Sequence, residues 1–346
     1  MSRAAEREVA ARLASAWGRG ECLHSVTDRG RHLLRARMAS GELISPYPGL
    51  YDTPDHWQKL NGSEKHLHVL RALSSAHPGW VFCQRSAAVA HGILQLAPRM
   101  LLKPQALRSP RSHAFRSKEV EWHPTGAYEP SVAGGVPVTD IVRTTFDCLR
   151  SLDFCSAMPV ADAALAKLGW TPDELLRSFG RFSGYRGAAA ARRRVVLSDA
   201  RCENGGESML RARILALGFA CPRIQVELAD PLNPDQPYRP DCLWLPPGMS
   251  EDEFSRMLRL GELPPGSLAG GVAGELDGWD KYVNPQMAKD GFDKAVLDER
   301  RRESRLTLLG LKFVRFSYAE ACSDSYVERM LLVAGVPRLS APIPGL

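Results

Sequence analysis

The last part of the chain contains short segments in which apolar side chains recur at every second position, separated by helical patterns and by glycine- and proline-rich stretches. This two-residue period predicts strands, and the 3.6-residue period predicts helices. The strands are expected at 223–229, 238–245, 272–277 and 311–316, and the helices at 204–217, about 286–309 and 317–334. The element order α-β-β-β-α-β requires a mixed α/β unit with a small sheet covered by helices.

Acidic residues lie on these elements at positions that suit a metal site. Glu275 and Asp277 are two residues apart at the end of the third strand, so they should point to one face of the sheet. Asp241 on the neighbouring strand and Glu207 on the first helix can approach the same place. Mg²⁺ prefers carboxylate, water and phosphate oxygens, and it can polarise a phosphate and supply hydroxide. We therefore expect Glu207, Asp241 and Glu275 as Mg²⁺ ligands, with Asp241, Glu275 and Asp277 as catalytic residues.

Length and residue usage restrict the number of domains and the kind of protein that the chain can form. At 346 residues the chain is expected to form two or three domains. It has no run of 18 apolar residues and no apolar signal core at its N-terminus, which favours a cytoplasmic protein without a membrane span. The eight cysteines form no CxxC pair and suit reduced thiols.

Charge and histidine are unevenly distributed. Residues 1–198 have 27 Lys+Arg against 17 Asp+Glu, and residues 199–346 have 18 against 22. A basic front half favours a polyanionic partner such as nucleic acid, although uneven surface charge also arises without a partner. All nine histidines lie at or before His123, so the rear half alone cannot form a His–Cys zinc site or a Ser–His–Asp triad. Carboxylate side chains are therefore the candidates for a functional site in the rear half.

The front of the chain resembles a DNA-binding module in its element order. Helices are expected at 3–17 and 28–39, the second capped by Thr27 or Asp28, followed by a short hairpin over 43–51. Two helices followed by a β-wing indicate a winged helix-turn-helix, in which Leu34 and Met38 should face inward. The candidate DNA contacts are the outward arginines of the second helix, Arg29, Arg31, Arg35 and Arg37. The alternative is a small packing domain with a solvated arginine face.

Three motifs in the front half carry a family resemblance. They are residues 41–51 (GELISPYPGLY), residues 86–92 (SAAVAHG) and residues 136–147 (VPVTDIVRTTFD). In this order and spacing they resemble the abortive-infection AbiEi antitoxin family. The resemblance covers about residues 1–195 and implies a winged helix, an α/β middle domain, and transcriptional autorepression beside a nucleotidyltransferase toxin. His91, in an apolar helix, is expected to be structural. Thr139 is expected to cap a helix over 140–151. On that helix Arg143 and Asp147, four residues apart, are expected to form a structural ion pair.

The rear half resembles the PD-(D/E)XK nuclease superfamily, and within it the short domains allied to very-short-patch repair endonucleases. The shared features are the Glu207-Ser208 helix, the Arg239-Pro240-Asp241 strand, the Glu275-Leu276-Asp277-Gly278 strand end and a late helix with Glu299 and Arg302. The superfamily has lysine two residues after the third-strand acid, where this chain has Asp277. Lys281, or an arginine from the long helix, is the candidate to replace that lysine.

Three domains are therefore expected: a winged helix at 1–58, a middle α/β domain at 59–198 and a nuclease-like domain at 199–336. Two functions remain open. The first is a DNA-binding, Mg²⁺-dependent endonuclease in phage defence or a toxin–antitoxin system. The second is an AbiEi-type repressor or antitoxin with an inactive nuclease fold.

Overall fold

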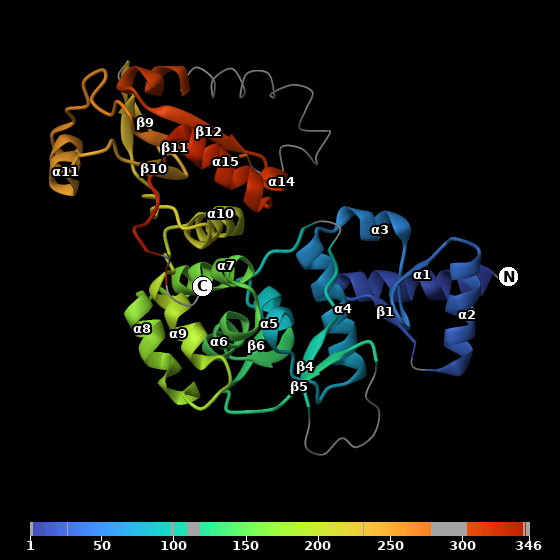
Figure 1. Cartoon of the computed structure of the whole chain (residues 1–346). Helices are drawn as coiled ribbons and strands as arrows, with labels where there is room; N and C mark the ends of the chain where they lie inside the picture. Colours follow the sequence, from blue (N-terminus) through green and yellow to red (C-terminus); the bar gives the residue numbers. More distant parts are fainter. Residues whose placement is uncertain are drawn as a thin grey trace. The chain divides into compact units, whose positions relative to one another are not determined.

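The computed structural model describes residues 3–25, 27–97, 100–108, 118–230, 232–277, 303–341 and 343. The chain forms two compact units, the first comprising Met1–Leu152 and Trp170–Val195 and the second Asp153–Gly169 and Val196–Leu346. Both units mix helices with small sheets, so the protein belongs to the mixed α and β class (Figure 1). No helix of the described residues is long and apolar enough to cross a membrane.

The front of unit 1 is a small helix-and-sheet segment. Its elements are α1 (Arg3–Gly18), β1 (Leu23–His24), α2 (Asp28–Ala39), β2 (Ile44–Tyr47) and β3 (Leu50–Asp52). The strands form an antiparallel sheet in the order β1-β3-β2. Val9 and Leu13 of α1 pack with Leu34 of α2 in one apolar core, and Figure 1 shows α2 running across the direction of α1. Of the two cap residues considered for α2, Thr27 is the one that accepts a hydrogen bond from Gly30 N.

The rest of unit 1 surrounds a second core that the front segment shares. Its elements are α3 (Pro54–Lys59), α4 (Gly62–Ala76), α5 (Gln84–Ala90), β4 (Gln105–Leu107), β5 (Glu121–His123), β6 (Pro130–Ala133), β7 (Val136–Thr139), α6 (Ile141–Ser151), α8 (Pro172–Ser178), a 3₁₀ turn (Phe179–Phe182) and α9 (Ala188–Val196). Strands β4 and β5 are parallel, and β6 and β7 form a hairpin. Val69 and Leu70 of α4 are fully buried in the same cluster as Leu50 of β3, so the front segment is packed onto α4.

Helix α6 carries a buried charge network. Arg143 Nε lies 2.7 Å from Asp147 Oδ2, and Arg150 Nε lies 2.7 Å from Asp147 Oδ1. The expected structural ion pair is confirmed. The expected cap is wrong: Asp140, not Thr139, accepts from Arg143 N. Thr139 is held in β7, and its hydroxyl lies 2.8 Å from the Thr144 hydroxyl.

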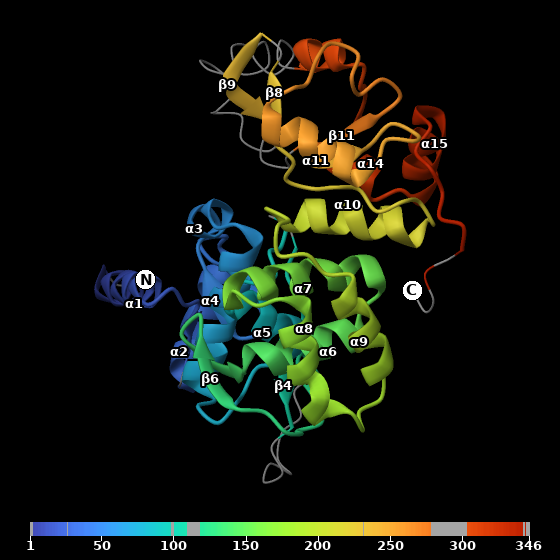
Figure 2. The same cartoon turned by 90° about the vertical axis from the view of Figure 1, so that its left-hand side faces the viewer.

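Unit 2 contains a sheet with helices on both faces. Its elements are α7 (Phe154–Leu168), α10 (Gly205–Ala216), β8 (Leu228–Asp230), β9 (Asn233–Tyr238), β10 (Cys242–Trp244), α11 (Glu251–Leu260), β11 (Val272–Leu276), a 3₁₀ turn (Thr307–Leu309), β12 (Lys312–Phe316), α14 (Tyr318–Ala321) and α15 (Asp324–Ala334). The sheet order is β10-β11-β12, antiparallel and then parallel, and β8 and β9 form a separate hairpin. Helix α10 runs beside α7 (Figure 2), and α15 packs along β12 (Figure 1).

The two faces of this sheet bury different clusters. Residues Cys242, Val272 and Val314 pack toward α10 and α15. Residues Leu243, Ala273 and Phe313 pack on the other face with Phe254 of α11. Successive side chains of β11 and β12 therefore point to opposite faces of the sheet, and residues two apart point to the same face.

Several expected elements of unit 2 differ in their bounds. The strand expected at 223–229 is reduced to Leu228–Asp230, because Gln225 has a φ of 58° that a continuous strand does not allow. The strand expected at 238–245 is divided around Pro240, which has no N–H for a strand ladder. The expected final helix is divided at Ser323, which is extended. Most of the expected helix 286–309 lies outside the described residues, as does Lys281; residues 303–306 are helical.

Candidate functional site

The acidic residues predicted in the rear half reach the sheet of unit 2 from different sides. Glu275 follows Ala273 by two residues on β11 and accepts a hydrogen bond from the Tyr238 hydroxyl, so it lies on the face toward α11. Glu207 is on α10, which packs on the opposite face. Asp241 lies just before β10, where its Oδ2 accepts from Leu276 N at 2.7 Å.

Each of these carboxylates already has a protein donor. Glu207 Oε2 accepts from Glu203 N at 2.9 Å. Asp277 Oδ1 lies 2.8 Å from Arg315 Nη2, and Arg315 Nη1 lies 3.1 Å from Glu303 Oε2. Arg315 comes from β12, whereas the arginines at 300–302 of the expected long helix lie outside the described residues.

Burial and mutual repulsion shift two of the carboxyl groups toward the protonated form. Burial, with a contribution from the charge of Asp241, raises the pKa of Glu207 to about 7. Burial also raises the pKa of Asp241, with contributions from the charges of Glu203 and Asp277. The acids are therefore close enough to repel one another, which is a common property of functional carboxylate clusters.

The donor set of Glu207, Asp241, Glu275 and Asp277 has the oxygen chemistry that Mg²⁺ prefers. Among the described residues, the ligand atoms of Glu207, Asp241, Glu275 and Asp277 do not include three within 4.8 Å of one another. Oxygen ligands of Mg²⁺ lie about 2.0–2.1 Å from the ion, which places neighbouring ligands about 3 Å apart. Among the described residues, these carboxylates form a hydrogen-bonded acidic cluster without three ligand atoms gathered at one point.

The elevated pKa of Glu207 predicts a pH-dependent contribution to stability. Between its ordinary value of 4.5 and about 7, the folded protein keeps a proton that the unfolded chain releases, so this contribution is present at low pH and declines as pH rises through that window. Glu207→Gln should therefore gain stability relative to the native protein as pH rises from about 4.5 to about 7. Urea unfolding of both proteins at a series of pH values checks this. A constant difference across the window contradicts it, since a lost hydrogen bond alone gives a pH-independent offset.

The predicted DNA-contacting arginines of α2 divide into two groups. Arg31 and Arg35 are exposed, as expected. Arg37 is only 6% exposed and lies 3.5 Å from Glu42, so its expected outward position is wrong. Met38 was expected to face inward, but its side chain is 42% exposed, and Arg37 is buried in its place. The side chain of Arg29 lies outside the described part of the molecule.

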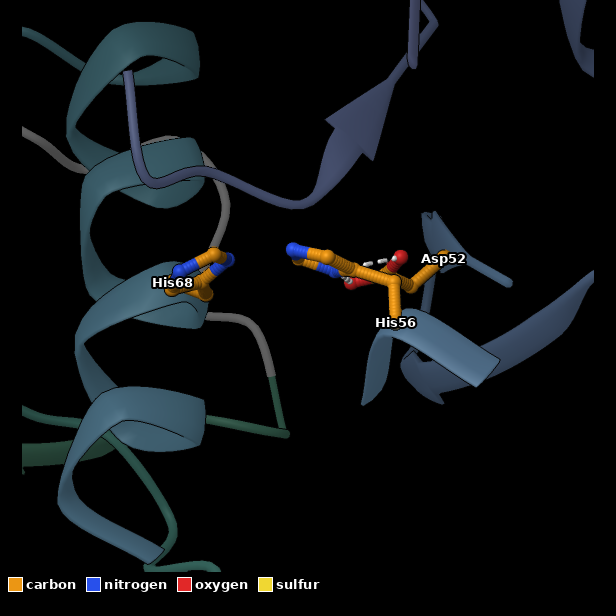
Figure 3. Close-up of side chains that lie close together, drawn as sticks. All are labelled: Asp52, His56 and His68. Atoms are coloured by element: carbon orange, nitrogen blue, oxygen red, sulfur yellow. Dashed lines mark hydrogen bonds and ion pairs between the residues drawn. The ribbon is translucent and has the colours of Figure 1, made fainter. Parts of the chain in front are cut away.

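A cluster of side chains that could ligate a metal ion, which the sequence analysis missed, lies in unit 1. It comprises Asp52 at the end of β3, His56 on α3 and His68 on α4, and one ligand atom from each lies within 4.8 Å of the others. His56 Nδ1 lies 3.0 Å from both Asp52 oxygens. Figure 3 shows the rings of His56 and His68 turned toward each other, with Asp52 beside His56. The restriction of all nine histidines to the front half was the available signal.

A network of aromatic and backbone groups holds this cluster in place. The Trp17 ring stacks on His56 with centroids 4.4 Å apart, and Trp17 Nε1 donates to Asp52 Oδ1 at 2.9 Å. Thr53 N donates to the same oxygen at 2.8 Å. His91, by contrast, lies 2.8 Å from the carbonyl oxygen of Thr139 and has the structural role expected for it.

Comparison of the chain with protein-family models, curated proteins and solved structures finds no match.

Proposed function

We propose that this protein is a DNA-binding regulator of the AbiEi antitoxin type, with a nuclease-like rear unit that is not arranged for Mg²⁺-dependent cleavage. The observation that carries the proposal is the pair of exposed arginines on α2, the helix that directly precedes the β2–β3 hairpin. In winged-helix proteins this helix enters the major groove and the hairpin contacts the backbone.

The local structure of the front segment supports this assignment. Arg31 and Arg35 are one helical turn apart, while Leu34 faces the core formed with α1. The β2–β3 turn contains Gly49 with a φ of 79°, a conformation that glycine adopts without strain. A tight, exposed turn of this kind suits a wing that approaches a phosphate backbone.

The arrangement of the rear unit supports regulation over cleavage. Asp277 forms an ion pair with Arg315, and Glu275 accepts a hydrogen bond from the Tyr238 hydroxyl. Asp241 accepts a hydrogen bond from the backbone N–H of Leu276. A nuclease needs such carboxylates to converge on the ion that activates water. Under this proposal the rear unit serves as a structural or DNA-handling module. A nucleotidyltransferase toxin is the functional partner that the family resemblance implies.

A Mg²⁺-dependent endonuclease is the second candidate. It is favoured by the elevated pKa values of Glu207 and Asp241, because a divalent cation would relieve the repulsion that contributes to them. The two candidates differ in what happens to DNA after binding, so one pair of measurements on the full chain separates them.

The deciding experiment combines DNA binding with plasmid cleavage. We expect the protein to bind duplex DNA with a salt-dependent affinity and to leave supercoiled plasmid intact with Mg²⁺, with Mn²⁺ or with EDTA. Nicking that requires Mg²⁺ and is lost in both Asp241→Ala and Glu275→Ala, with DNA binding retained, would establish the endonuclease instead. Absence of DNA binding at low salt would refute both.

A further inference from the structure

We propose that Asp52, His56 and His68 form a binding site for a divalent transition-metal ion of the zinc class, which fastens the front segment to helix α4. The three residues come from three consecutive elements, β3, α3 and α4, that meet inside unit 1. The proposal does not depend on the rear unit or on its acidic cluster.

The first support is the orientation of His56. Its Nδ1 faces the Asp52 carboxylate at 3.0 Å, and Asp52 is fully buried. A carboxylate that accepts from one ring nitrogen fixes the tautomer, so that the other nitrogen, Nε2, presents a lone pair. Figure 3 shows this other edge of the ring directed toward His68. Metal-bound histidines are commonly oriented by a carboxylate in this way.

The second support is an unpaired nitrogen on His68. The side chain is 7% exposed, and its Nδ1 is buried without a hydrogen-bond partner in the described structure. Buried polar atoms are nearly always paired, and a bound ion is one of the few groups that can account for an orphaned ring nitrogen.

The charges and distances around the cluster are compatible with an ion. Asp52 and Glu64 contribute negative charge near His68, and Arg71 contributes one positive charge. Zinc–nitrogen bonds of about 2.0–2.1 Å place two tetrahedral ligands about 3.4 Å apart. The ligand atoms here lie within 4.8 Å of one another, so side-chain movements of roughly 1 Å bring them to that spacing.

The chemistry of the donors selects the class of metal. The two imidazoles, one of them oriented by the Asp52 carboxylate, suit Zn²⁺ and its first-row neighbours, whereas Mg²⁺ and Ca²⁺ prefer oxygen ligands. Binding would join β3 and α3, which close the front segment, to α4. An ion that binds only the folded form stabilises it by mass action. The ion would thereby set the position of the proposed DNA-binding segment on the rest of unit 1.

The experiment uses the full chain, stripped with a chelator and titrated with Co²⁺ and then Zn²⁺. We expect visible absorption bands of Co²⁺ with imidazole ligands at one equivalent, displacement of these bands by Zn²⁺, and a rise in melting temperature with Zn²⁺. The rear half has no histidine, so an imidazole signal must come from the front half. Long-range ¹⁵N–¹H spectra should show the ring-nitrogen resonances of His56 and His68 shifting on metal addition.

Variants identify the ligands. His68→Ala and His56→Gln should each lose the bands and the melting shift, while His32→Ala, which removes an exposed histidine of α2, should keep both. If the native protein gives no bands, no melting shift and unmoved His56 and His68 nitrogens, the cluster is only a structural Asp–His pair beneath Trp17 and the proposal is overturned. That measurement needs no variant and therefore remains decisive if a variant does not fold.

Discussion

Replacement of Asp147 by alanine should cost about 3–5 kcal/mol of the free energy of unfolding, the expected loss when one member of a buried ion pair is removed. Asp147 is 1% exposed and lies 2.7 Å from both Arg143 Nε and Arg150 Nε. Its removal leaves the Arg143 guanidinium buried, at 2% exposure, without its carboxylate. Urea unfolding should show a large fall in the midpoint with little change in the slope.

The matched control is Asp173→Ala. Asp173 is an exposed acid in the first turn of α8, in the same unit, and its removal should cost less than about 1 kcal/mol. Asp147→Asn separates charge from shape, because the amide keeps one acceptor for an arginine but removes the charge. A loss in Asp147→Ala as small as that in Asp173→Ala would mean that the network does not stabilise the fold.

The sequence was sufficient where local chemistry decides the structure. The bounds of α2 follow from Thr27 as its cap and from the glycine at position 41 that follows its end, and the observed helix is Asp28–Ala39. The cap of α6 was predicted wrongly because Thr139 and Asp140 are both good cap residues. The pairing of Thr139 with Pro130 in the β6–β7 hairpin decides between them, and sequence spacing does not reveal that pairing.

The candidate metal site in unit 1 illustrates the same limit. His66 and His68 are both on α4, but His66 lies 3.0 Å from the Ser86 hydroxyl while His68 faces His56. Which histidine reaches α3 depends on the rotation of α4 about its axis, and tertiary packing sets that rotation. In unit 2, β11 ends at Leu276, and Arg315, the register partner of Glu275, forms the ion pair with Asp277. The approach of Glu207 from the other face follows from how α10 packs on the sheet.

Removal of Arg31 and Arg35 together should weaken DNA binding by at least about tenfold and reduce the log–log salt slope by about two units, because each lost phosphate contact removes roughly one unit. Both side chains are exposed on α2, so the double alanine variant should fold normally. Fluorescence anisotropy with labelled duplex DNA at several salt concentrations measures the affinity and the slope together.

The control for charge alone is Arg192→Ala with Arg193→Ala. These arginines are exposed on α9 of the same unit, and the double variant lowers the net charge by the same two units. If α2 holds the DNA, only the α2 variant should lose affinity and slope strongly, because a general charge effect acts equally from both helices. Equal losses in the two variants would mean that DNA responds to net charge and not to this helix. Unchanged binding in the α2 variant would remove the observation on which the proposed regulator rests.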